Sequence, residues 1–440
     1  MSPEEVLAVV NATANASMEA YYWWCTAIMV CIHAGFMMYE MGVSRARNVL
    51  ASGVKNILAF AFMIPTFFLF GWWLYWAYGT GNIFIPDASA EFAQYYVPWS
   101  DGMGPNLQDG ASGVFWAAFV LFSATTASIV SGSVIERIRM SSWIILAVLV
   151  GSVVWIIGAG WGWSAGGWLV TQWGYHDVGA AGVVHVISGF FALGILINLG
   201  PRVGRFNADG SANDLAGHNA PLTIAGLMII IIGFFGFLGG CLIYPAVMAG
   251  SAADAGWLTI YGSPATLSSF AFNTLMSFGG GIIGAYLITK DPFWMMSGAL
   301  GGIFCAASGL DLWYPGTAFA LGFLGGVVIP YSHKLITSWG IDDAVGAVSV
   351  HGTCGLIGVM ATGILLGGYP PPVDGIPAIT FTGQLVGAIA MVLLGFIPGY
   401  VVSWILKQCG ILRVSDAIQN YGIDNAEIAT PSYPEFQRSQ

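Results

Sequence analysis

The sequence predicts an all-α polytopic membrane protein with eleven transmembrane helices, arranged as two inverted repeats of five helices and one additional helix. Three observations carry this fold class. Hydrophobic residues make up 57% of the chain and charged residues only 8%, whereas a soluble protein carries roughly 25% charged residues. Apolar stretches of the ~20 residues that a spanning helix needs recur along the whole chain. The basic residues, finally, fall on alternate connections between those stretches.

Eleven apolar stretches are candidates for spanning a bilayer, and the short connections leave little room for a separate soluble domain. In chain order they are residues 21–43, 56–78, 112–135, 141–163, 179–200, 219–247, 263–289, 292–309, 314–335, 344–367 and 378–407. We expect the repeats to cover residues 21–200 and 219–367. Residues 1–407 then form one membrane domain, and residues 408–440 form a cytoplasmic tail. The 61 glycines favour close packing between helices in lipid.

The distribution of lysine and arginine predicts the orientation of these spans. All twelve lie after odd-numbered spans or in the tail: Arg45, Arg47 and Lys55 after the first, Arg137 and Arg139 after the third, Arg202 and Arg205 after the fifth, Lys290 after the seventh, Lys334 at the end of the ninth, and Lys407, Arg413 and Arg438 at or after the end of the eleventh. The intervening connections contain none. Because cytoplasmic loops carry the excess of basic residues, we expect the amino terminus outside and the carboxyl terminus in the cytoplasm. The chain is therefore expected in the plasma or inner membrane as a multi-pass protein.

Charge and cysteine content exclude several other classes of protein. The formal net charge is -10, and the basic residues serve as membrane anchors, so we expect no binding of nucleic acid. The six cysteines lie within or at the ends of apolar spans without CxxC spacing: Cys25, Cys31, Cys241, Cys305, Cys354 and Cys409. This pattern indicates neither a disulfide framework nor a metal site. We expect no cofactor and no enzymatic activity, and membrane lipid as the surrounding partner.

Two histidines lie in the middle of apolar, glycine-rich stretches whose only other ionisable side chain is a cysteine. His185 and His351 are each preceded by valine and followed four residues later by glycine. An ionisable group at membrane depth is expensive, and it indicates a functional site by default. The alternative for either histidine is a core residue that bonds to backbone carbonyls. His33 in the first span has no motif support, and we interpret it as a packing histidine.

Dividing the spans as five, five and one places His185 on the fifth helix of one half and His351 on the fifth helix of the other. Spans 1 and 6 then run in opposite directions, as in an inverted-topology repeat. Each histidine is about six or seven residues into its helix, near 10 Å deep at ~1.5 Å per residue. We therefore expect the imidazoles to meet near the midplane. The spacing also allows an alternative, a membrane redox protein in which both histidines ligate haem.

Several motifs together resemble the ammonium transporter (Amt/Mep/Rh) family. Residues 177–185 resemble its D-x-A-G-x-x-V-V-H element, and residues 342–355 resemble its second histidine element. Three further elements follow the family order, at residues 35–48, 136–139 and 233–237. The resemblance extends from residue 35 to about residue 433, and the combination of motifs is highly specific.

The resemblance implies a homotrimer in which each subunit has its own narrow pore, lined by His185 and His351. It implies a phenylalanine gate toward the outside, made by Phe122 and Phe237. An aromatic vestibule above the gate, roofed by Trp163, would attract a small cation through the ring quadrupole. Trp161 and Trp168 are the alternatives for this position, because the segment is rich in tryptophan.

Two further residues complete the expected site. Cys241 occupies the small polar position four residues after Phe237, where the family often has a serine that bonds the incoming ammonium, and a thiol is a weaker partner. Asp177 lies at the outer start of the fifth span, where a carboxylate would cap free amide groups and favour the helix dipole. We favour this structural role over an electrostatic effect on the cation.

Three departures from the family pattern affect the expected substrate handling. Leu238 stands where asparagine is common. Residues 346–349 read Gly-Ala-Val-Ser where many members read D-V-F-G, which removes a carboxylate and an aromatic ring beside His351. In the tail, Ile428 and Ala429 replace the H-G pair. Coupling between subunits is therefore favoured over binding of a PII-type regulator.

These observations lead to one leading expectation and one alternative within the same fold. The leading function is an ammonium transporter or channel that recruits ammonium outside and passes ammonia, with proton relay, between the twin histidines. The alternative is an ammonium sensor or receptor that binds its ligand but conducts weakly or not at all. Methylammonium remains a second candidate substrate.

Overall fold

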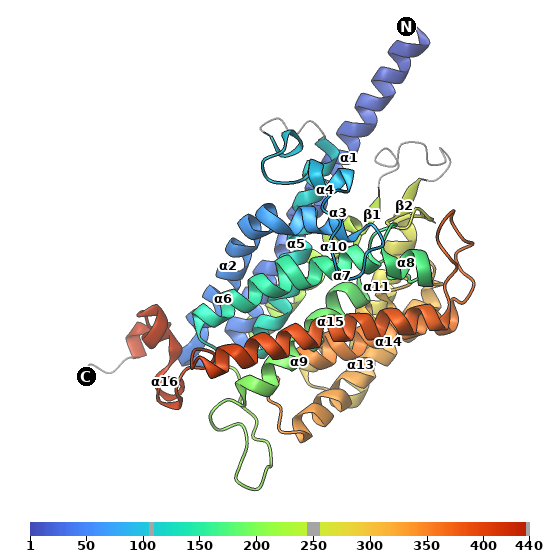
Figure 1. The fold of residues 1–440 in the computed structure, drawn as a ribbon. Helices are drawn as coiled ribbons and strands as arrows, with labels where there is room; N and C mark the ends of the chain where they lie inside the picture. Colours follow the sequence, from blue (N-terminus) through green and yellow to red (C-terminus); the bar gives the residue numbers. More distant parts are fainter. Residues whose placement is uncertain (105–109, 244–255, 437–440) are drawn as a thin grey trace.

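The bundle consists almost entirely of helices that run side by side (Figure 1). The structure, a computed structural model, describes residues 1–104, 110–243 and 256–436. Within these residues, ten helical stretches are long and apolar enough to cross a membrane. The eleventh expected span is an apolar helix of 16 residues, α12 (Pro292–Ala307). The polytopic all-α fold class is confirmed, with ten full-length spans and one shorter apolar helix in the described part of the chain.

The first half of the chain forms five spans, three of which contain a π-helical turn. They are α1 (Pro3–Val43), α2 (Val49–Thr66) continued through the π-turn Phe67–Gly71 into α3 (Trp72–Tyr78), α5 (Gly110–Ser133), α6 (Met140–Leu149) continued through the π-turn Val150–Trp155 into α7 (Ile156–Gly162), and the π-turn Ala181–Val186 followed by α9 (Ile187–Leu199). Two short helices, α4 (Glu91–Tyr95) and α8 (Trp168–Trp173), lie in the connections.

The second half contains the remaining helices and a small sheet. They are α10 (Ala220–Gly240), α11 (Leu267–Thr289), α12, α13 (Pro315–Ser338), the π-turn Val348–Thr353 followed by α14 (Cys354–Leu365), α15 (Phe381–Gln408) and α16 (Asp416–Tyr421). The antiparallel sheet has the order β1 (Leu242–Ile243), β2 (Trp257–Thr259), β3 (Pro264–Ala265).

Several expected boundaries were wrong, each for a local reason. The helix that contains the first expected span, residues 21–43, begins already at Pro3, because Ser2 and Glu5 form a capping box. The sixth span was expected to reach residue 247, but its helix ends at Gly240 and the chain continues as a strand; residues 244–247 lie outside the described residues. A short apolar run cannot be assigned to helix or strand by hydropathy alone. The seventh helix begins after residue 263 because Thr266 accepts a hydrogen bond from the Ser269 amide at 3.0 Å and caps it.

Basic residues from separate connections meet at one end of the bundle, the end that also carries α16 (Figure 1). The guanidinium of Arg45, after α1, pairs with Glu136, after α5, with Nε 2.6 Å from Oε2. Arg202, after α9, pairs with the buried Asp342 at 2.9 Å. Arg413 of the tail donates to the carbonyl of Pro201 at 2.7 Å. The alternate connections identified from the sequence thus share one end of the molecule.

Candidate functional site

The two histidines are in direct contact inside the bundle. His185 Nδ1 lies 3.1 Å from His351 Nδ1, and the ring centroids are 5.2 Å apart. His185 is fully buried and His351 is nearly so. A distance of 3.1 Å is that of a hydrogen bond, so one Nδ1 donates and the other accepts. Two metal–nitrogen bonds of about 2 Å each would hold the nitrogens roughly 4 Å apart, so this geometry does not fit a haem iron between the rings.

Asp177 builds the start of the first histidine helix. Its Oδ2 accepts hydrogen bonds from the amides of Gly182 at 2.8 Å and Val183 at 2.9 Å. Ala180 adopts a left-handed conformation with φ 64°, which turns the chain into the π-turn that carries His185. The carboxylate therefore satisfies amide groups that have no partner within the helix. Its Oδ1 has no hydrogen-bond partner among the described residues, and burial raises the pKa of Asp177 while the amide donors oppose that rise.

Asp343 caps the start of the second histidine helix in the same way, a role that was not predicted from the sequence. Its Oδ2 accepts from the amide of Val348 at 2.7 Å, and its Oδ1 accepts from the hydroxyl of Ser133 at 2.9 Å. Gly346 supplies the left-handed conformation with φ 73°. In both helices the aspartate stands eight residues before the histidine, and the left-handed residue stands three after the aspartate. From that common spacing, the capping role of Asp343 could have been predicted.

Glycines let the two histidine helices cross in close contact. A Cβ on Gly189 would lie 2.5 Å from the Cα of Gly352. A Cβ on Gly355 would lie 2.6 Å from the carbonyl of Ala181 and 3.2 Å from the amide of Val186. At each crossing, the glycine four residues after one histidine thus lies against the residue that directly follows the other histidine. This close approach holds the imidazoles within hydrogen-bond distance.

Phe304 of α12 forms an aromatic wall beside both imidazoles, and the sequence analysis did not identify it. Its ring centroid lies 3.7 Å from that of His185, at an interplanar angle of 26°, and 4.6 Å from that of His351. Phe304 is fully buried. No spacing or family motif singled it out among the 27 phenylalanines.

The two expected gate residues are in contact. Phe122 of α5 and Phe237 of α10 meet edge to face, with ring centroids 4.4 Å apart. Both are fully buried. The ring of Phe237 is 5.9 Å from that of His185. Of these two phenylalanines, which come from helices far apart in the chain, Phe237 lies beside His185 and Phe122 contacts Phe237.

Trp163 packs edge to face against Phe122, with ring centroids 5.0 Å apart. Its indole N–H donates to the carbonyl of Val178 at 3.3 Å. It is fully buried. The alternatives Trp161 and Trp168 are only partly buried and form their own edge-to-face pair at 5.7 Å. Of the three tryptophans, Trp163 is the one whose ring contacts the Phe122–Phe237 pair.

Cys241 is turned toward the main chain of its own helix. Its thiol donates to the carbonyl of Phe237 at 3.3 Å and is fully buried. The hydrogen that a substrate could use is therefore engaged with the backbone. Leu238, the neighbouring departure from the family pattern, is also buried.

The space left by the missing side chain at Gly346 is filled by another aromatic residue. A Cβ on Gly346 would lie 2.9 Å from the ring of Trp294, and that ring lies 4.8 Å from the imidazole of His333. Both residues line a cavity of about 320 Å³ that also includes Asp343. Where residues 346–349 depart from the D-V-F-G pattern, the ring of Trp294 from α12 thus lies against the backbone of Gly346.

A charged cluster supports this end of the second histidine helix. Asp342 pairs with Arg202 at 2.9 Å, with Arg205 at 3.4 Å and with Arg137 at 3.9 Å. Burial opposes the ionisation of Asp342, but Arg137 and Arg202 outweigh it and hold its pKa below the ordinary value. Burial lowers the pKa of Arg137 to about 10, so this guanidinium stays charged at neutral pH.

Known proteins resemble this chain along nearly all of its length. The family model described as Ammonium Transporter Family matches residues 20–433. An ammonium transporter, Amt1, of Methanocaldococcus jannaschii is 30% identical over 417 residues, covering 94% of this chain and 96% of the relative. Amt2 of Archaeoglobus fulgidus is 30% identical over 450 residues, covering 96% and 90%.

Solved structures share the fold at lower identity. A structure titled Sensor Amt Protein has a TM-score of 0.78 at 23% identity and covers 94% of this chain and 99% of that one. Mep2 of Candida albicans has a TM-score of 0.74 at 19% identity and covers 91% and 86%.

Proposed function

We propose that this chain, which belongs to the ammonium transporter family, takes up ammonium at an outer aromatic site and passes ammonia along its buried histidine pair, which relays the proton. The observation that carries the proposal is the 3.1 Å contact between His185 and His351, next to Phe237 of the Phe122–Phe237 pair. A multi-pass membrane protein that belongs to this family is a transport protein and not an enzyme.

The route follows from the order of the aromatic contacts. Trp163 contacts Phe122, Phe122 contacts Phe237, and Phe237 lies beside His185. We assign Trp163 to the recruitment site, where an aromatic face attracts a cation by roughly 0.5–2 kcal/mol. The two phenylalanines form the gate below it. Because their rings touch, a substrate can pass only when they rotate apart.

The chemistry of this route discriminates ammonium from potassium. A hydrophobic constriction rejects a hydrated cation, and potassium has no proton to release. Ammonium can transfer its proton to the histidine pair, which relays it, and cross the apolar segment as ammonia. The histidine pair has one N–H between two Nδ1 atoms, so each ring can offer or accept a hydrogen bond as the proton moves. Phe304 packs against both imidazoles, stacked on His185 at 26° and tilted by 30° to His351.

We further propose that the two histidine helices are equivalent members of an inverted repeat. Support comes from the matched aspartates, Asp177 and Asp343, which cap their helices eight residues before each histidine. The reciprocal glycine crossings relate the two helices in the same way in both directions. We assign Asp177 the structural role of a helix cap, since its Oδ2 accepts from the amides of Gly182 and Val183 and its one further hydrogen bond in the described part of the chain comes from the hydroxyl of Tyr175 at 3.3 Å.

The arrangement in the membrane is also a proposal. The shared basic end of the bundle favours a cytoplasmic carboxyl terminus and an external amino terminus. We propose a homotrimer, the assembly that the family resemblance implies. The tail docks on its own subunit through Arg413, which supports a role in coupling, and the replaced Ile428–Ala429 pair makes a PII-type regulator the weaker alternative.

A receptor of the same fold is the second candidate function. It is favoured by the thiol of Cys241, which donates to a backbone carbonyl and is not free for an incoming ammonium. The structural neighbour titled Sensor Amt Protein has the same fold, which establishes that likeness alone.

Transport and sensing are separated by one pair of measurements. The protein is reconstituted in liposomes on a solid-supported membrane and given an ammonium pulse, and ammonium-dependent thermal stabilisation is measured on the same preparation. The transport proposal predicts a current or a luminal pH change. Stabilisation by ammonium without either signal would support the receptor and contradict transport.

A further inference from the structure

The cavity that Trp294 and His333 line is large enough for a ligand of its own. It measures about 320 Å³. It lies between the end of α1, the starts of α10 and α12, the helix α13 and the connections that precede α10 and the second histidine helix. A water molecule takes up ~30 Å³ in the liquid, and an ammonium ion is of similar size. This Trp294 cavity can therefore hold a ligand several times larger than ammonium.

One wall of the Trp294 cavity is aromatic. Phe293 and Trp294 meet there edge to face, with ring centroids 4.8 Å apart at an interplanar angle of 80°. The ring of Trp294 lies 4.8 Å from the imidazole of His333. Aromatic faces attract a cation, and they also pack against an alkyl chain. Apolar side chains continue this wall: Val43, Leu215 and Ile224.

The charged groups around the Trp294 cavity favour a ligand with one positive charge. The described residues that line it include the carboxylates Asp214, Asp291 and Asp343 and the guanidinium groups of Arg202 and Arg205. Asp342 pairs with both of these guanidinium groups, at 2.9 Å and 3.4 Å, and with Arg137 at 3.9 Å. Together these are four carboxylates and three guanidinium groups, which leaves one negative charge in excess.

Several hydrogen-bond acceptors of the lining have capacity for a ligand. The carboxylate of Asp214 forms no hydrogen bond or ion pair with the described residues. Each oxygen of Asp343 accepts one hydrogen bond, whereas a carboxylate has about four acceptor positions. No hydrogen bond joins the imidazole of His333 to the described part of the chain, and a neutral imidazole has one accepting nitrogen. A primary ammonium group, with three N–H donors, matches this set of acceptors.

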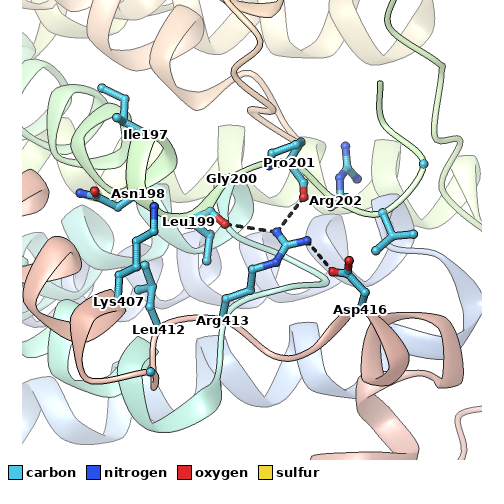
Figure 2. A pocket seen from close by; sticks show the side chains of 13 residues that line it. Ile197, Asn198, Leu199, Gly200, Pro201, Arg202, Lys407, Leu412, Arg413 and Asp416 are labelled. Atoms are coloured by element: carbon cyan, nitrogen blue, oxygen red, sulfur yellow. Dashed lines mark hydrogen bonds and ion pairs between the residues drawn. The ribbon is translucent and has the colours of Figure 1, made fainter. Parts of the chain in front are cut away.

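A neighbouring cavity has the opposite balance of charge (Figure 2). It measures about 580 Å³, and three cationic side chains line it: Arg202, Lys407 and Arg413. The carboxylate in its described lining is Asp416, which already pairs with Arg413 at 3.1 Å (Figure 2). An amine is therefore expected in the Trp294 cavity and not in this one.

We propose that the Trp294 cavity binds a monovalent primary alkylammonium ion larger than methylammonium. The ammonium group lies near Asp343, Asp214 and His333, and the alkyl chain lies along the rings of Phe293 and Trp294. The ligand enters from the basic end of the bundle, where the connection that carries Asp214 forms part of the lining. This site is separate from the route past His185 and His351.

The test is direct binding to the full chain, and its result does not depend on whether the protein transports ammonium. Purified protein is titrated by calorimetry with n-butylammonium, with n-butanol and with tetramethylammonium. We expect n-butylammonium to bind at least tenfold more tightly than n-butanol, which has the same alkyl chain without the charge. It should also bind more tightly than tetramethylammonium, which has no N–H donor.

Two substitutions locate the ligand within the cavity. Asp214→Asn should weaken n-butylammonium about fivefold, the effect of one charge at about 4 Å in a solvated site. Asp214 is exposed, so this variant should keep the unfolding midpoint of wild type. Trp294→Leu should weaken binding about tenfold, within the range for a cation on an aromatic face, and Trp294→Phe should retain most of the affinity.

The matched control is Asp209→Asn, which removes an exposed carboxylate from the same connection but outside the cavity. It should change the affinity less than twofold. Equal losses in the two asparagine variants, or no binding of n-butylammonium by wild type, would overturn the site. Butanol that binds as tightly as n-butylammonium would overturn the role of charge. Tetramethylammonium that binds as tightly would overturn the role of the N–H donors, and full affinity in Trp294→Leu would overturn the aromatic wall.

Discussion

Gly189→Ala is expected to separate the histidine pair without touching either imidazole. The added Cβ would lie 2.5 Å from the Cα of Gly352, while ordinary contacts of this kind begin at 3.4 Å. The helices must therefore move apart by about 0.9 Å, and both contacting groups are backbone, which cannot rotate away. The Nδ1–Nδ1 distance would grow from 3.1 Å to about 4 Å, beyond hydrogen-bond reach. Overpacking of this kind costs about 1–3 kcal/mol.

Two assays report the consequence. The ammonium-evoked current of Gly189→Ala in liposomes should fall by roughly 10- to 100-fold, the effect of misplacing reacting groups by about 1 Å. The thermal unfolding midpoint should fall by a few degrees. The control is Gly279→Ala in α11, where a Cβ would meet no atom within 4 Å and the loss of a helical glycine stabilises by about 0.5–1 kcal/mol. A Gly189→Ala protein with unchanged current and midpoint would refute the role of the helix crossing.

Three further predictions concern residues around the pair. Phe304→Ala should lower stability by about 3–5 kcal/mol and reduce the ammonium current, with partial recovery in Phe304→Leu; an unaltered current in the alanine variant would remove the aromatic wall from the mechanism. Asp177→Ala should lower the unfolding midpoint more than Asp177→Asn, since the asparagine oxygen can still accept the two amide hydrogen bonds. Equal losses in both would instead assign the effect to the charge. Asp342→Asn should cost about 3–5 kcal/mol, because it leaves buried guanidinium groups without their carboxylate. The pKa of Asp342 is lowered in the folded protein, so its stabilisation is complete above the ordinary pKa of about 3.9 and is lost only as the pH falls through the lower folded value. The difference between wild type and variant should then stay constant from about pH 8 to pH 5, and a difference that shrinks in this window would contradict the assignment.

The spans could be predicted from the sequence because hydrophobic length and charge placement act through the bilayer and need no tertiary contacts. Their ends could not. Ser2 and Thr266 determine where α1 and α11 begin. Such a cap acts on a single helical turn, which is too short a segment to be recognised from the hydropathy of the whole span. The strand after Gly240 and the π-turns before the histidines depend on contacts with other helices, which the local pattern does not encode.

The candidate site, like the fold, could be predicted from the sequence only in part. His185 and His351 were predicted as partners from matched ordinal positions, and Phe122 and Phe237 from motifs; all four lie together in the structure. Phe304 was missed because its part in the site depends on the packing of α12 against two other helices. The aspartate eight residues before each histidine was a repeat present in the sequence, and the cap of the second helix could have been predicted from it.

The central claim is that the contact between His185 and His351 lets ammonium shed and regain its proton while potassium is excluded. Its most direct test compares wild type, His185→Ala and His33→Ala in liposomes on a solid-supported membrane, with pulses of ammonium, methylammonium and potassium in parallel. His33 is also buried but lies on α1, and its nearest polar partner is Ser128. The account predicts that wild type and His33→Ala respond to ammonium and not to potassium, and that His185→Ala loses this discrimination. Unchanged selectivity in His185→Ala would contradict it.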